Sequence, residues 1–397
     1  MFYFIVTYGC QANKNESERQ ATFYEQKGLQ PTQDWREASY IFINTCSVRK
    51  AADDRVYALL NQMQTYFFDQ IISKDEHGQK QTRWQLKTGR QLPEVVLTGC
   101  MSRYQDKLLK KYPLLNKVQE PSSVSFDLLP KRKDQTQAFV QISIGCNSFC
   151  TYCVVPYARG REKSRSFEDV MRDVQQAVAD GYHEITLLGQ NVNSWGLEKV
   201  QIGSRKAGLA AAKLENLPQN RDQYHAYRGI PPFVKLLRAI SAIETVQKIR
   251  FLTSNPWDFY DELVEEIVTN KKIDRFLHLP VQSGSNAVLQ RMNRGYTREK
   301  YLNLIQRLQK ADPEITIGTD IIVGFGNETE AEFLETVDLV KRAHFIMAFV
   351  AMYSPRPGTV AAKIYPDKIP FAEKKRRFEI LDKMINKDQL DKRPKIV

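Results

Sequence analysis

The sequence predicts an α/β protein in two parts, an open parallel-sheet domain followed by a partial (β/α)6 barrel. Short apolar runs alternate with longer polar, helix-prone stretches along the chain, which is typical of parallel strands joined by helices. The first three apolar runs each end directly before a cysteine. The second part has six such runs, too few for a closed eight-stranded barrel.

Three strands are expected in the first part, and each leads into a cysteine. Cys10, Cys46 and Cys100 lie far apart in the sequence. Residues just past the carboxyl ends of parallel strands share one edge of the sheet, so we expect the three thiols to meet there. The expected strands are residues 2–9 (FYFIVTYG), 40–45 (YIFINT) and 94–99 (EVVLTG), with a helix after the first that ends at Gly28.

The second part repeats strand and helix six times. Ser166 and Thr329 each precede an acidic residue by three positions, the spacing of a capping box, and Asp258 and Thr297 are further N-cap candidates. Gly181 is expected to end a helix. The expected strands are residues 139–145, 184–191, 248–255, 275–283, 315–325 and 345–353.

Polar segments mark the boundaries between these parts. Residues 67–92 are expected to form an inserted hairpin or loop, and the basic residues 197–229 a surface excursion. The expected domains are residues 1–120, a linker at 121–137, the barrel at 138–370, and a charged helix or tail at 371–397.

Composition narrows the class of protein. Of 397 residues, 42% are hydrophobic and 26% charged, which excludes a mainly disordered chain. The longest apolar run, residues 345–353, spans nine residues, whereas a membrane helix needs about 20. No basic leader with a cleavage site is present, so we expect no signal peptide, no membrane and a cytoplasmic location. The balance 58 − 46 = +12 favours a polyanionic partner such as nucleic acid.

The motif GCNSFCTYC carries the chemistry. It spaces Cys146, Cys150 and Cys153 by three and two residues. Thiolates this close bind soft metals, and no nearby Cys or His supplies the fourth ligand that zinc usually needs. A [4Fe–4S] cube on three thiolates keeps one iron open. S-adenosylmethionine can chelate that iron. One electron then cleaves S-adenosylmethionine to methionine and a 5′-deoxyadenosyl radical. A partial zinc site or three incidental cysteines are the alternatives.

This spacing, with Tyr152 just before the last cysteine, resembles the radical S-adenosylmethionine (radical SAM) superfamily. The strand-end cysteines Cys10, Cys46 and Cys100 resemble the N-terminal domain of its methylthiotransferase family. In that family three such cysteines hold a second [4Fe–4S] cluster, whose free iron carries the sulfur to be inserted. Three buried free thiols are the alternative.

Longer stretches resemble the tRNA branch of the methylthiotransferases. They include TYGCQANKNESE, NTCSVRKAADDRV, GCNSFCTYCVVPYARGRE and HLPVQSGSNAVLQRMNRGYTREKY. The resemblance implies an enzyme that replaces C2–H of N6-isopentenyladenosine, beside the tRNA anticodon, with S–CH3. One S-adenosylmethionine supplies the radical and a second the methyl group. The implied cofactors are two [4Fe–4S] clusters and S-adenosylmethionine, and the implied partners are the anticodon stem-loop, an external electron donor and a sulfur source.

Three alternatives remain open at this point. A related enzyme would act on threonylcarbamoyladenosine in tRNA, or on a ribosomal protein. A protein of another class would be a non-catalytic iron–sulfur or zinc RNA-binding scaffold, which would not cleave S-adenosylmethionine.

The resemblance also implies contacts to S-adenosylmethionine at strand ends, where capping or turn roles are the alternative. Arg159 and Arg161 are expected to pair with a carboxylate or with RNA phosphate, unless they form surface salt bridges. His278 and His344 are expected to be structural. The implied cofactor contacts are Tyr152, Gly189, Gln190, Asn191, Ser254, Gln282 and Asp320.

Three departures from the family pattern stand out. The inserts before Cys100 and after Gly196 are longer than in the family. Gly326 and Asn327 replace a usual Pro-Gly pair. The family usually ends in a small tRNA-binding β-barrel (TRAM), but only 397 − 361 = 36 residues follow Ala361, and they read as helical and charged. We therefore expect the barrel to be absent and the basic residues of 371–397 to contact RNA phosphates.

Overall fold

A computed structural model describes residues 1–47, 50–74, 77, 79–121, 126–134, 136–197 and 229–387. The chain divides into two units. Unit 1 comprises Met1–Lys133 with the short segment Tyr157–Gly160, and unit 2 comprises Asp134–Pro156 with Arg161–Val397. Most of the expected excursion at residues 197–229 lies outside the described residues.

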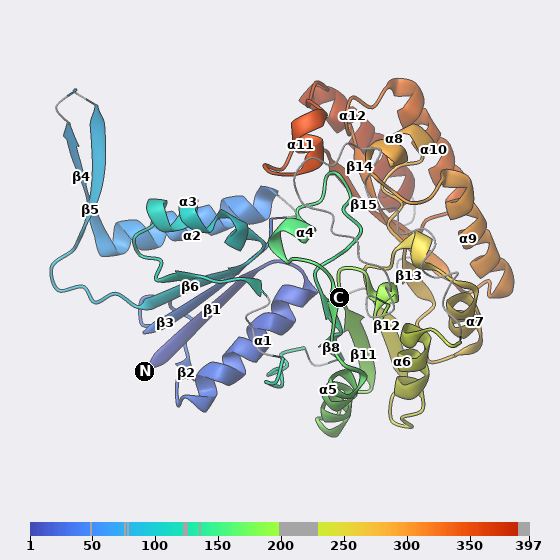
Figure 1. The fold of residues 1–397 in the computed structure, drawn as a ribbon, viewed down its shortest axis with the longest axis horizontal. Coiled ribbons are helices and arrows are strands. Elements are labelled where there is room, and N and C mark those ends of the chain that lie inside the picture. Colours follow the sequence, from blue (N-terminus) through green and yellow to red (C-terminus); the bar gives the residue numbers. More distant parts are fainter. Residues whose placement is uncertain are drawn as a thin grey trace. The chain divides into compact units, whose positions relative to one another are not determined.

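Unit 1 is built on an open parallel sheet, as predicted. Its strand order is β2-β1-β3-β6-β7, and every pair is parallel (Figure 1). The three expected strands are confirmed almost to the residue. The strands are β1 (Phe2–Tyr8), β2 (Gln30–Pro31), β3 (Tyr40–Thr45), β6 (Glu94–Gly99) and β7 (Lys117–Val118).

Helices cover both faces of this sheet. The central strand β3 alternates its buried side chains. Phe42 packs in the cluster that holds Tyr24 of α1 (Gln11–Gln26), while Ile41 packs with Leu60 of α2 (Lys50–Phe67). A strand buried on both faces requires a continuous apolar run, which is why YIFI is recognisable in the sequence.

The insert at residues 67–92 is a hairpin, which settles the choice between hairpin and loop. Strands β4 (Phe68–Lys74) and β5 (Lys80–Leu86) pair antiparallel and separately from the main sheet. The hairpin extends away from the sheet of its own unit (Figure 1).

Unit 2 contains the six predicted parallel strands in chain order. They form two three-stranded sheets, and a parallel bridge between Ile249 and Ile273 joins the two. The result is the expected open (β/α)6 barrel, with one large apolar core between strands and outer helices. The strands are β8 (Gln137–Gln141), β11 (Glu184–Leu188), β12 (Lys248–Phe251), β13 (Phe276–His278), β14 (Thr316–Val323) and β15 (Met347–Met352). The helices that enter that core are α5 (Phe167–Ala179), α6 (Pro232–Ser241), α7 (Asp261–Thr269), α8 (Asn286–Arg291), α9 (Arg298–Ala311), α10 (Glu330–Ala343) and α12 (Phe371–Asp382).

Several expected strands differ in extent, and the second and third end at Leu188 and Phe251, short of the expected residues 191 and 255. The first splits into β8 and β9 (Ser143–Ile144), and β9 pairs antiparallel with β10 (Lys163–Ser164). The strand expected at residues 275–283 is only three residues long, because Pro280 cannot donate to a neighbouring strand and Gln282 adopts φ +72°.

Most predicted helix boundaries are confirmed. The side chains of Ser166, Thr297 and Thr329 each accept a backbone N–H from three residues further on, and Gly181 follows α5 with φ +91°. The prediction for Asp258 is wrong, because α7 begins at Asp261. The Asp258 carboxylate instead accepts a hydrogen bond from Asn191 Nδ2 at 2.5 Å.

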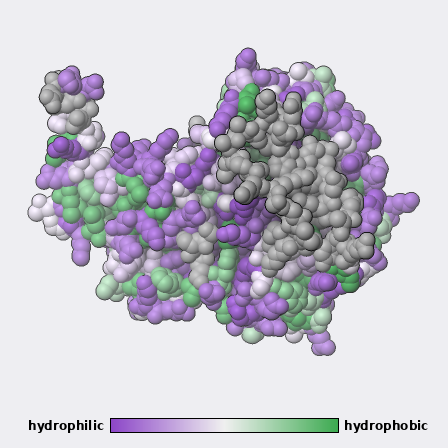
Figure 2. All heavy atoms as spheres, in the orientation of Figure 1, coloured by the Kyte–Doolittle hydropathy of each residue, from purple (hydrophilic) through white to green (hydrophobic). Residues whose placement is uncertain are grey.

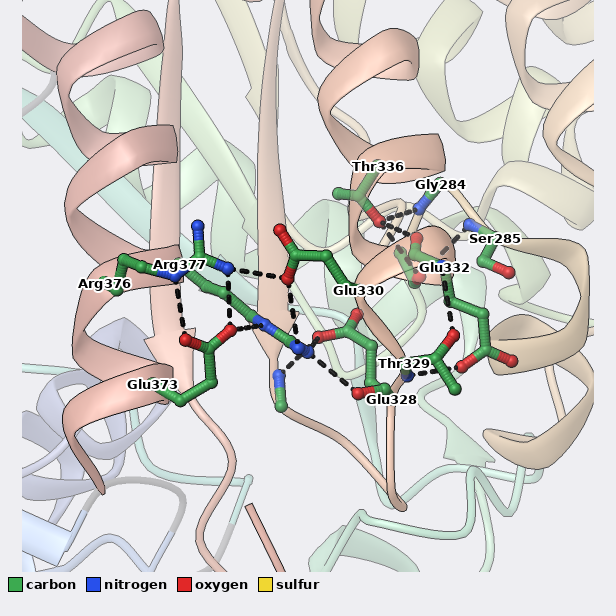
Figure 3. Close-up of polar contacts among 12 residues, drawn as sticks. Gly284, Ser285, Glu328, Thr329, Glu330, Glu332, Thr336, Glu373, Arg376 and Arg377 are labelled. Carbon is green, nitrogen blue, oxygen red and sulfur yellow. Dashed lines mark hydrogen bonds and ion pairs between the residues drawn. The ribbon is translucent and has the colours of Figure 1, made fainter. Parts of the chain in front are cut away.

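The C-terminal segment is helical, as predicted, but two of its basic side chains point into the protein. In α12 (Phe371–Asp382), Lys374 and Arg377 are buried, and Arg377 pairs with Glu328 and Glu373 (Figure 3). The expectation that these two side chains contact RNA is therefore wrong. Residues 388–397 lie outside the described residues.

One face of the molecule is shown in Figure 2, coloured by residue hydropathy. Hydrophilic side chains cover much of the visible face (Figure 2). Within the described residues, no helix combines the length and the apolar character that crossing a membrane requires.

Candidate functional site

The cysteines of unit 1 lie at one edge of the sheet, as its topology predicts. The strand register pairs Tyr8 with Thr45, and Thr45 with Gly99. Cys46 directly follows Thr45, and Cys100 directly follows Gly99. Cys10 lies two residues past Tyr8. Cys46 and Cys100 are buried, whereas Cys10 is exposed.

Backbone geometry holds Cys46 and Cys100 together. Gly99 has φ +90°, and a Cβ there would lie 2.0 Å from the carbonyl oxygen of Thr45. Only glycine therefore lets β6 end so close to β3. The Thr45 hydroxyl donates to the Thr98 carbonyl at 2.6 Å and accepts the Met101 N–H at 3.1 Å. A hydrogen bond from Cys46 and the nearby Arg159 guanidinium lower the pKa of Cys100 to about 6, and the thiolate is the form that ligates metals.

A buried polar network starts at Cys10 and runs along the first turns of α1. The Cys10 thiol lies 3.3 Å from Asn13 Oδ1, and Asn13 Nδ2 donates to Asn44 Oδ1 at 2.6 Å. Asn44 Nδ2 in turn donates to the Glu16 carboxylate at 3.3 Å. The network fixes the start of α1 against the end of β3.

Arg159 completes this network. Its Nη1 lies 2.5 Å from Glu16 Oε1, and both side chains are 1% exposed. Burial alone would lower the pKa of Arg159, but Glu16, Cys100 and Cys10 raise it well above its ordinary value. Arg159 is thus neither a surface salt bridge nor an RNA contact, but a cation next to thiols. Arg161 is exposed, and its guanidinium lies 4.7 Å from the Phe149 ring centroid.

The second cysteine triplet occupies the loop between β9 and α4 (Val155–Ala158). Each sulfur lies near one N–H donor. The Ser148 amide is 3.5 Å from Cys146 Sγ, the Val155 amide 3.4 Å from Cys153 Sγ, and Arg294 Nη1 3.4 Å from Cys150 Sγ. Hydrogen bonds to cysteine sulfurs are a standard feature of iron–sulfur sites.

Burial of this loop disfavours a free thiolate. Burial and the Glu162 carboxylate raise the pKa of Cys146 to about 12. Metal binding releases thiol protons, so a bound metal would replace the proton and balance the carboxylate.

Residues 291–294 anchor the loop on both sides of Cys150. The Thr151 amide donates to the Met292 carbonyl at 3.0 Å, and the Thr151 hydroxyl to the Arg291 carbonyl at 2.8 Å. Asn293 Nδ2 donates to the Phe149 carbonyl at 3.2 Å. Tyr152 packs edge-on against Phe325, with 6.1 Å between ring centroids.

The strand ends of unit 2 contain buried polar atoms without partners. Among the described residues, nothing hydrogen-bonds to Ser143 Oγ, Asn191 Oδ1 or Ser254 Oγ. A Cβ at Gly189 would lie 2.6 Å from Ser143 Oγ. Buried polar groups are normally satisfied, so this edge fits a polar ligand that is bound close to the backbone.

The other expected contacts are distributed around the same strands. Gln190, of intermediate exposure, follows β11 between Gly189 and Asn191. Gln282 is buried, and its backbone N–H donates to the backbone carbonyl of Asp320 at 2.8 Å. The Asp320 carboxylate lies 3.3 Å from His278 Nε2. His344 ends α10 in a left-handed conformation.

The donor sets fit clusters better than single ions. Within the described ranges, no group of three or more His, Cys, Asp or Glu side chains is placed to hold one metal ion. A four-iron cube holds its thiolates farther apart than a single ion does, and its usual protein ligands are Cys thiolates alone. Both triplets consist only of cysteine, so they fit cubes.

Comparison with known proteins identifies the family. The Radical SAM superfamily model matches residues 140–340, and that of Uncharacterized protein family UPF0004 matches residues 2–118. A tRNA-2-methylthio-N(6)-dimethylallyladenosine synthase from Moorella thermoacetica is 39% identical over 99% of this chain and 84% of its own length. The chain belongs to this synthase family, within the radical SAM superfamily. Synthases of the same name from Thermotoga petrophila and Carboxydothermus hydrogenoformans are 38% and 36% identical, over 96% and 97% of this chain and 81% and 83% of their own lengths.

Solved structures support the fold of this synthase-family member. The radical S-adenosylmethionine methyltransferase TsrM from Kitasatospora setae, solved with cobalamin and a [4Fe–4S] cluster bound, matches 91% of this chain and 77% of its own. The TM-score is 0.58 at 12% sequence identity. The similarity therefore concerns the fold alone.

Several residues of these sites were not foreseen from the sequence. Glu16 and Asn13 read as ordinary helix residues, and the motif MNRGY was recognised without a role for Arg294. Their one sequence signal is a polar side chain at a position that a strand or helix buries. That signal appears only when the packing of the element is known.

Proposed function

We propose that this chain is a tRNA methylthiotransferase that converts N6-isopentenyladenosine beside the anticodon to its 2-methylthio derivative. The supporting observation is the pair of all-cysteine triplets, one at the edge of an open parallel sheet and one in the loop after the first barrel strand. Full-length relatives at 36–39% identity carry the name of this activity.

Each triplet is proposed to hold one [4Fe–4S] cluster through three thiolates. Cys10, Cys46 and Cys100 form one ligand set, and Cys146, Cys150 and Cys153 form the other. With S-adenosylmethionine also bound, the cluster held by Cys146, Cys150 and Cys153 would supply the one-electron reduction that reductive cleavage of the cofactor requires. The Ser148, Val155 and Arg294 N–H groups orient the three sulfurs of this set.

The cofactor is proposed to bind across the strand ends of unit 2. Ser143, Asn191 and Ser254 offer unpaired buried oxygens, and Gly189, which has no side chain, leaves room for Ser143 Oγ beside the backbone. Asp320 on β14 has a partly exposed carboxylate, with 34% of its side chain exposed, and is proposed to bind a ribose hydroxyl. Gln190, Gln282 and Tyr152 complete the proposed contact set.

The partners follow from the reaction. The substrate is the anticodon stem-loop of tRNA, and a net charge of +12 favours a polyanion. An external one-electron donor and a sulfur source are required, because the chain itself supplies neither electrons nor inserted sulfur. We place the reaction in the cytoplasm, where tRNA is found.

The test is a product analysis. Anaerobically reconstituted protein is incubated with reductant, S-adenosylmethionine and tRNA that carries isopentenyladenosine, and the nucleosides are resolved by mass spectrometry. We expect 2-methylthio-N6-isopentenyladenosine, and we expect Cys150→Ala to abolish both it and 5′-deoxyadenosine. The matched control is tRNA with threonylcarbamoyladenosine.

Each alternative predicts a different result. Methylthiolation of threonylcarbamoyladenosine alone, or of ribosomal protein alone, would replace the proposed substrate. No cleavage of S-adenosylmethionine by fully iron-loaded protein would favour the non-catalytic scaffold.

A further inference from the structure

Arg294 is a buried cation in unit 2 whose donors all have defined targets. Nη2 donates to the Pro280 carbonyl at 2.8 Å, and Nε to the Tyr296 hydroxyl at 3.1 Å. The remaining arm, Nη1, lies 3.4 Å from Cys150 Sγ. The guanidinium carbon also lies 4.6 Å from the Trp257 ring centroid. The side chain is therefore fixed in one position against one sulfur.

The buried guanidinium of Arg294 has no carboxylate as its counter-charge among the described residues. No Asp or Glu of the described residues lies within ion-pair distance of it, and its hydrogen-bond acceptors are a carbonyl, a hydroxyl and a thiol sulfur. Of the four other arginines buried among the described residues, three pair with a carboxylate, namely Arg159 with Glu16, Arg165 with Asp173 and Arg377 with Glu328. The fourth, Arg19, donates to Asn15 Oδ1 and to the Phe126 carbonyl.

A buried charge without a partner is strongly unfavourable. The negative group within reach of Arg294 is the sulfur of Cys150 when it is a metal-bound thiolate. A cube with a 2+ core on three thiolates has net charge −1, and one-electron reduction makes it −2. The arginine charge is thus best balanced when a cluster is bound, and it favours the reduced form over the oxidised one.

We propose that Arg294 is a positioning residue that orients Cys150 and raises the reduction potential of the cluster held by Cys146, Cys150 and Cys153. This inference rests on the proposed function. Net charge and hydrogen bonds to sulfur are two of the properties that set the potential of an iron–sulfur cluster. Arg294 supplies both at one ligand, and its own position is fixed by Pro280 and Tyr296.

The position of Arg294 in the chain supports this role. The turn that presents it contains Met292 and Asn293, which bond to the backbone on either side of Cys150. Asn293 adopts φ +57°, which turns the chain directly after α8. The same short segment therefore holds the cysteine loop by its backbone and the central sulfur by a side chain.

The test isolates this cluster in the full-length chain. Cys10→Ala, Cys46→Ala and Cys100→Ala are combined, so that the remaining triplet binds about four iron per chain. The midpoint potential is then measured by an anaerobic redox titration followed by electron paramagnetic resonance. Arg294→Gln keeps an N–H donor without the charge, and Arg294→Lys keeps the charge without the planar fork.

We expect the midpoint potential to become more negative in Arg294→Gln, with a changed resonance spectrum, and to shift less in Arg294→Lys. Arg291→Gln is the matched control, because Arg291 belongs to the same segment but pairs with Glu332 at 2.8 Å. If Arg294→Gln folds but takes up no iron while Arg294→Lys regains it, the positioning role is supported.

Two results would overturn the inference. One is an unchanged potential and spectrum in Arg294→Gln at full iron content, and the other is an equal negative shift in Arg291→Gln. Failure of the parent protein to bind iron at all would instead refute the proposed function, so the two failures are distinguishable.

Discussion

At the residue scale, the buried ion pair between Glu16 and Arg159 is expected to contribute strongly to the stability of the fold around Cys10 and Cys100. The pair lies beneath Cys10 and Cys100, and Glu16 also accepts a hydrogen bond from Asn44. Removing one partner of a buried pair leaves the other charge uncompensated, at a cost of about 3–5 kcal/mol. We expect Glu16→Gln to lower the free energy of unfolding of the metal-free protein by about this amount, measured by urea denaturation.

The matched control is an exposed ion pair in the same unit. Lys131 Nζ lies 2.7 Å from Glu25 Oε1, and its side chain is 55% exposed. Lys131→Gln should cost no more than about 1 kcal/mol. Equal losses in the two variants would contradict the structural role of the Glu16–Arg159 pair.

The sequence predicted the cysteines of these sites but not their polar surroundings. The position of a cysteine directly after an apolar strand can be predicted, because the carboxyl end of the strand lies at a known edge of the sheet. No such rule places Arg159, since the four-residue segment Tyr157–Gly160 belongs to unit 1 although it follows Cys153 in sequence. Arg159 was therefore singled out without its place beside the cysteines, and Arg294 was missed altogether, because its target sulfur lies more than a hundred positions away.

At the scale of secondary-structure elements, helix α12 shows that a helix rich in charged residues can pack in the core. Arg377 Nη1 donates to Glu328 Oε2 at 2.9 Å, and these two side chains are 5% and 1% exposed. Arg376, its neighbour, is 45% exposed and pairs with Glu330 and Glu373 (Figure 3). The two residues form a matched pair, since they share the helix and differ in burial.

We expect Arg377→Gln to destabilise the protein by about 3–5 kcal/mol and Arg376→Gln by at most about 1 kcal/mol, in urea denaturation. Burial raises the pKa of Glu328 above its ordinary value of 4.5, while the Gly324 amide and Arg377 lower it. Without Arg377, the Gly324 amide is the remaining one of these two groups that lowers the pKa of Glu328, so we expect that pKa to rise further.

This change has a defined pH dependence. A carboxyl whose pKa is raised in the folded state binds more protons folded than unfolded, so stability falls as pH rises through the folded pKa. The deficit of Arg377→Gln relative to Arg376→Gln should therefore be larger at neutral pH than in mild acid. A deficit that does not change with pH would mean that Glu328 stays ionised without Arg377.

Elements were predicted best where one local rule decides them. The strand β3 matches its expected range because it is apolar on both faces, and Thr329 caps α10 through a complete capping box. Asp258 was an N-cap candidate by residue type, but its carboxylate accepts a hydrogen bond from Asn191 Nδ2 instead. Tertiary hydrogen bonds override local preference at the strand ends, which is also where the proposed cofactor contacts lie.

The whole chain carries its two cysteine triplets in separate compact units. Cys10, Cys46 and Cys100 depend on the register of β1, β3 and β6. Cys146, Cys150 and Cys153 depend on the loop held by residues 291–294. Because no strand or helix is shared between these supports, the two clusters should assemble independently.

Combined Cys10→Ala and Cys46→Ala should therefore lower the iron content from about eight to about four per chain, without stopping 5′-deoxyadenosine formation. The methylthiolated nucleoside should disappear, because the sulfur-carrying centre is lost. The reciprocal variant, Cys150→Ala with Cys153→Ala, should retain about four iron and form no 5′-deoxyadenosine. Loss of all iron in either variant would show that one triplet cannot assemble without the other, and the reaction could not then be divided between two separately built centres.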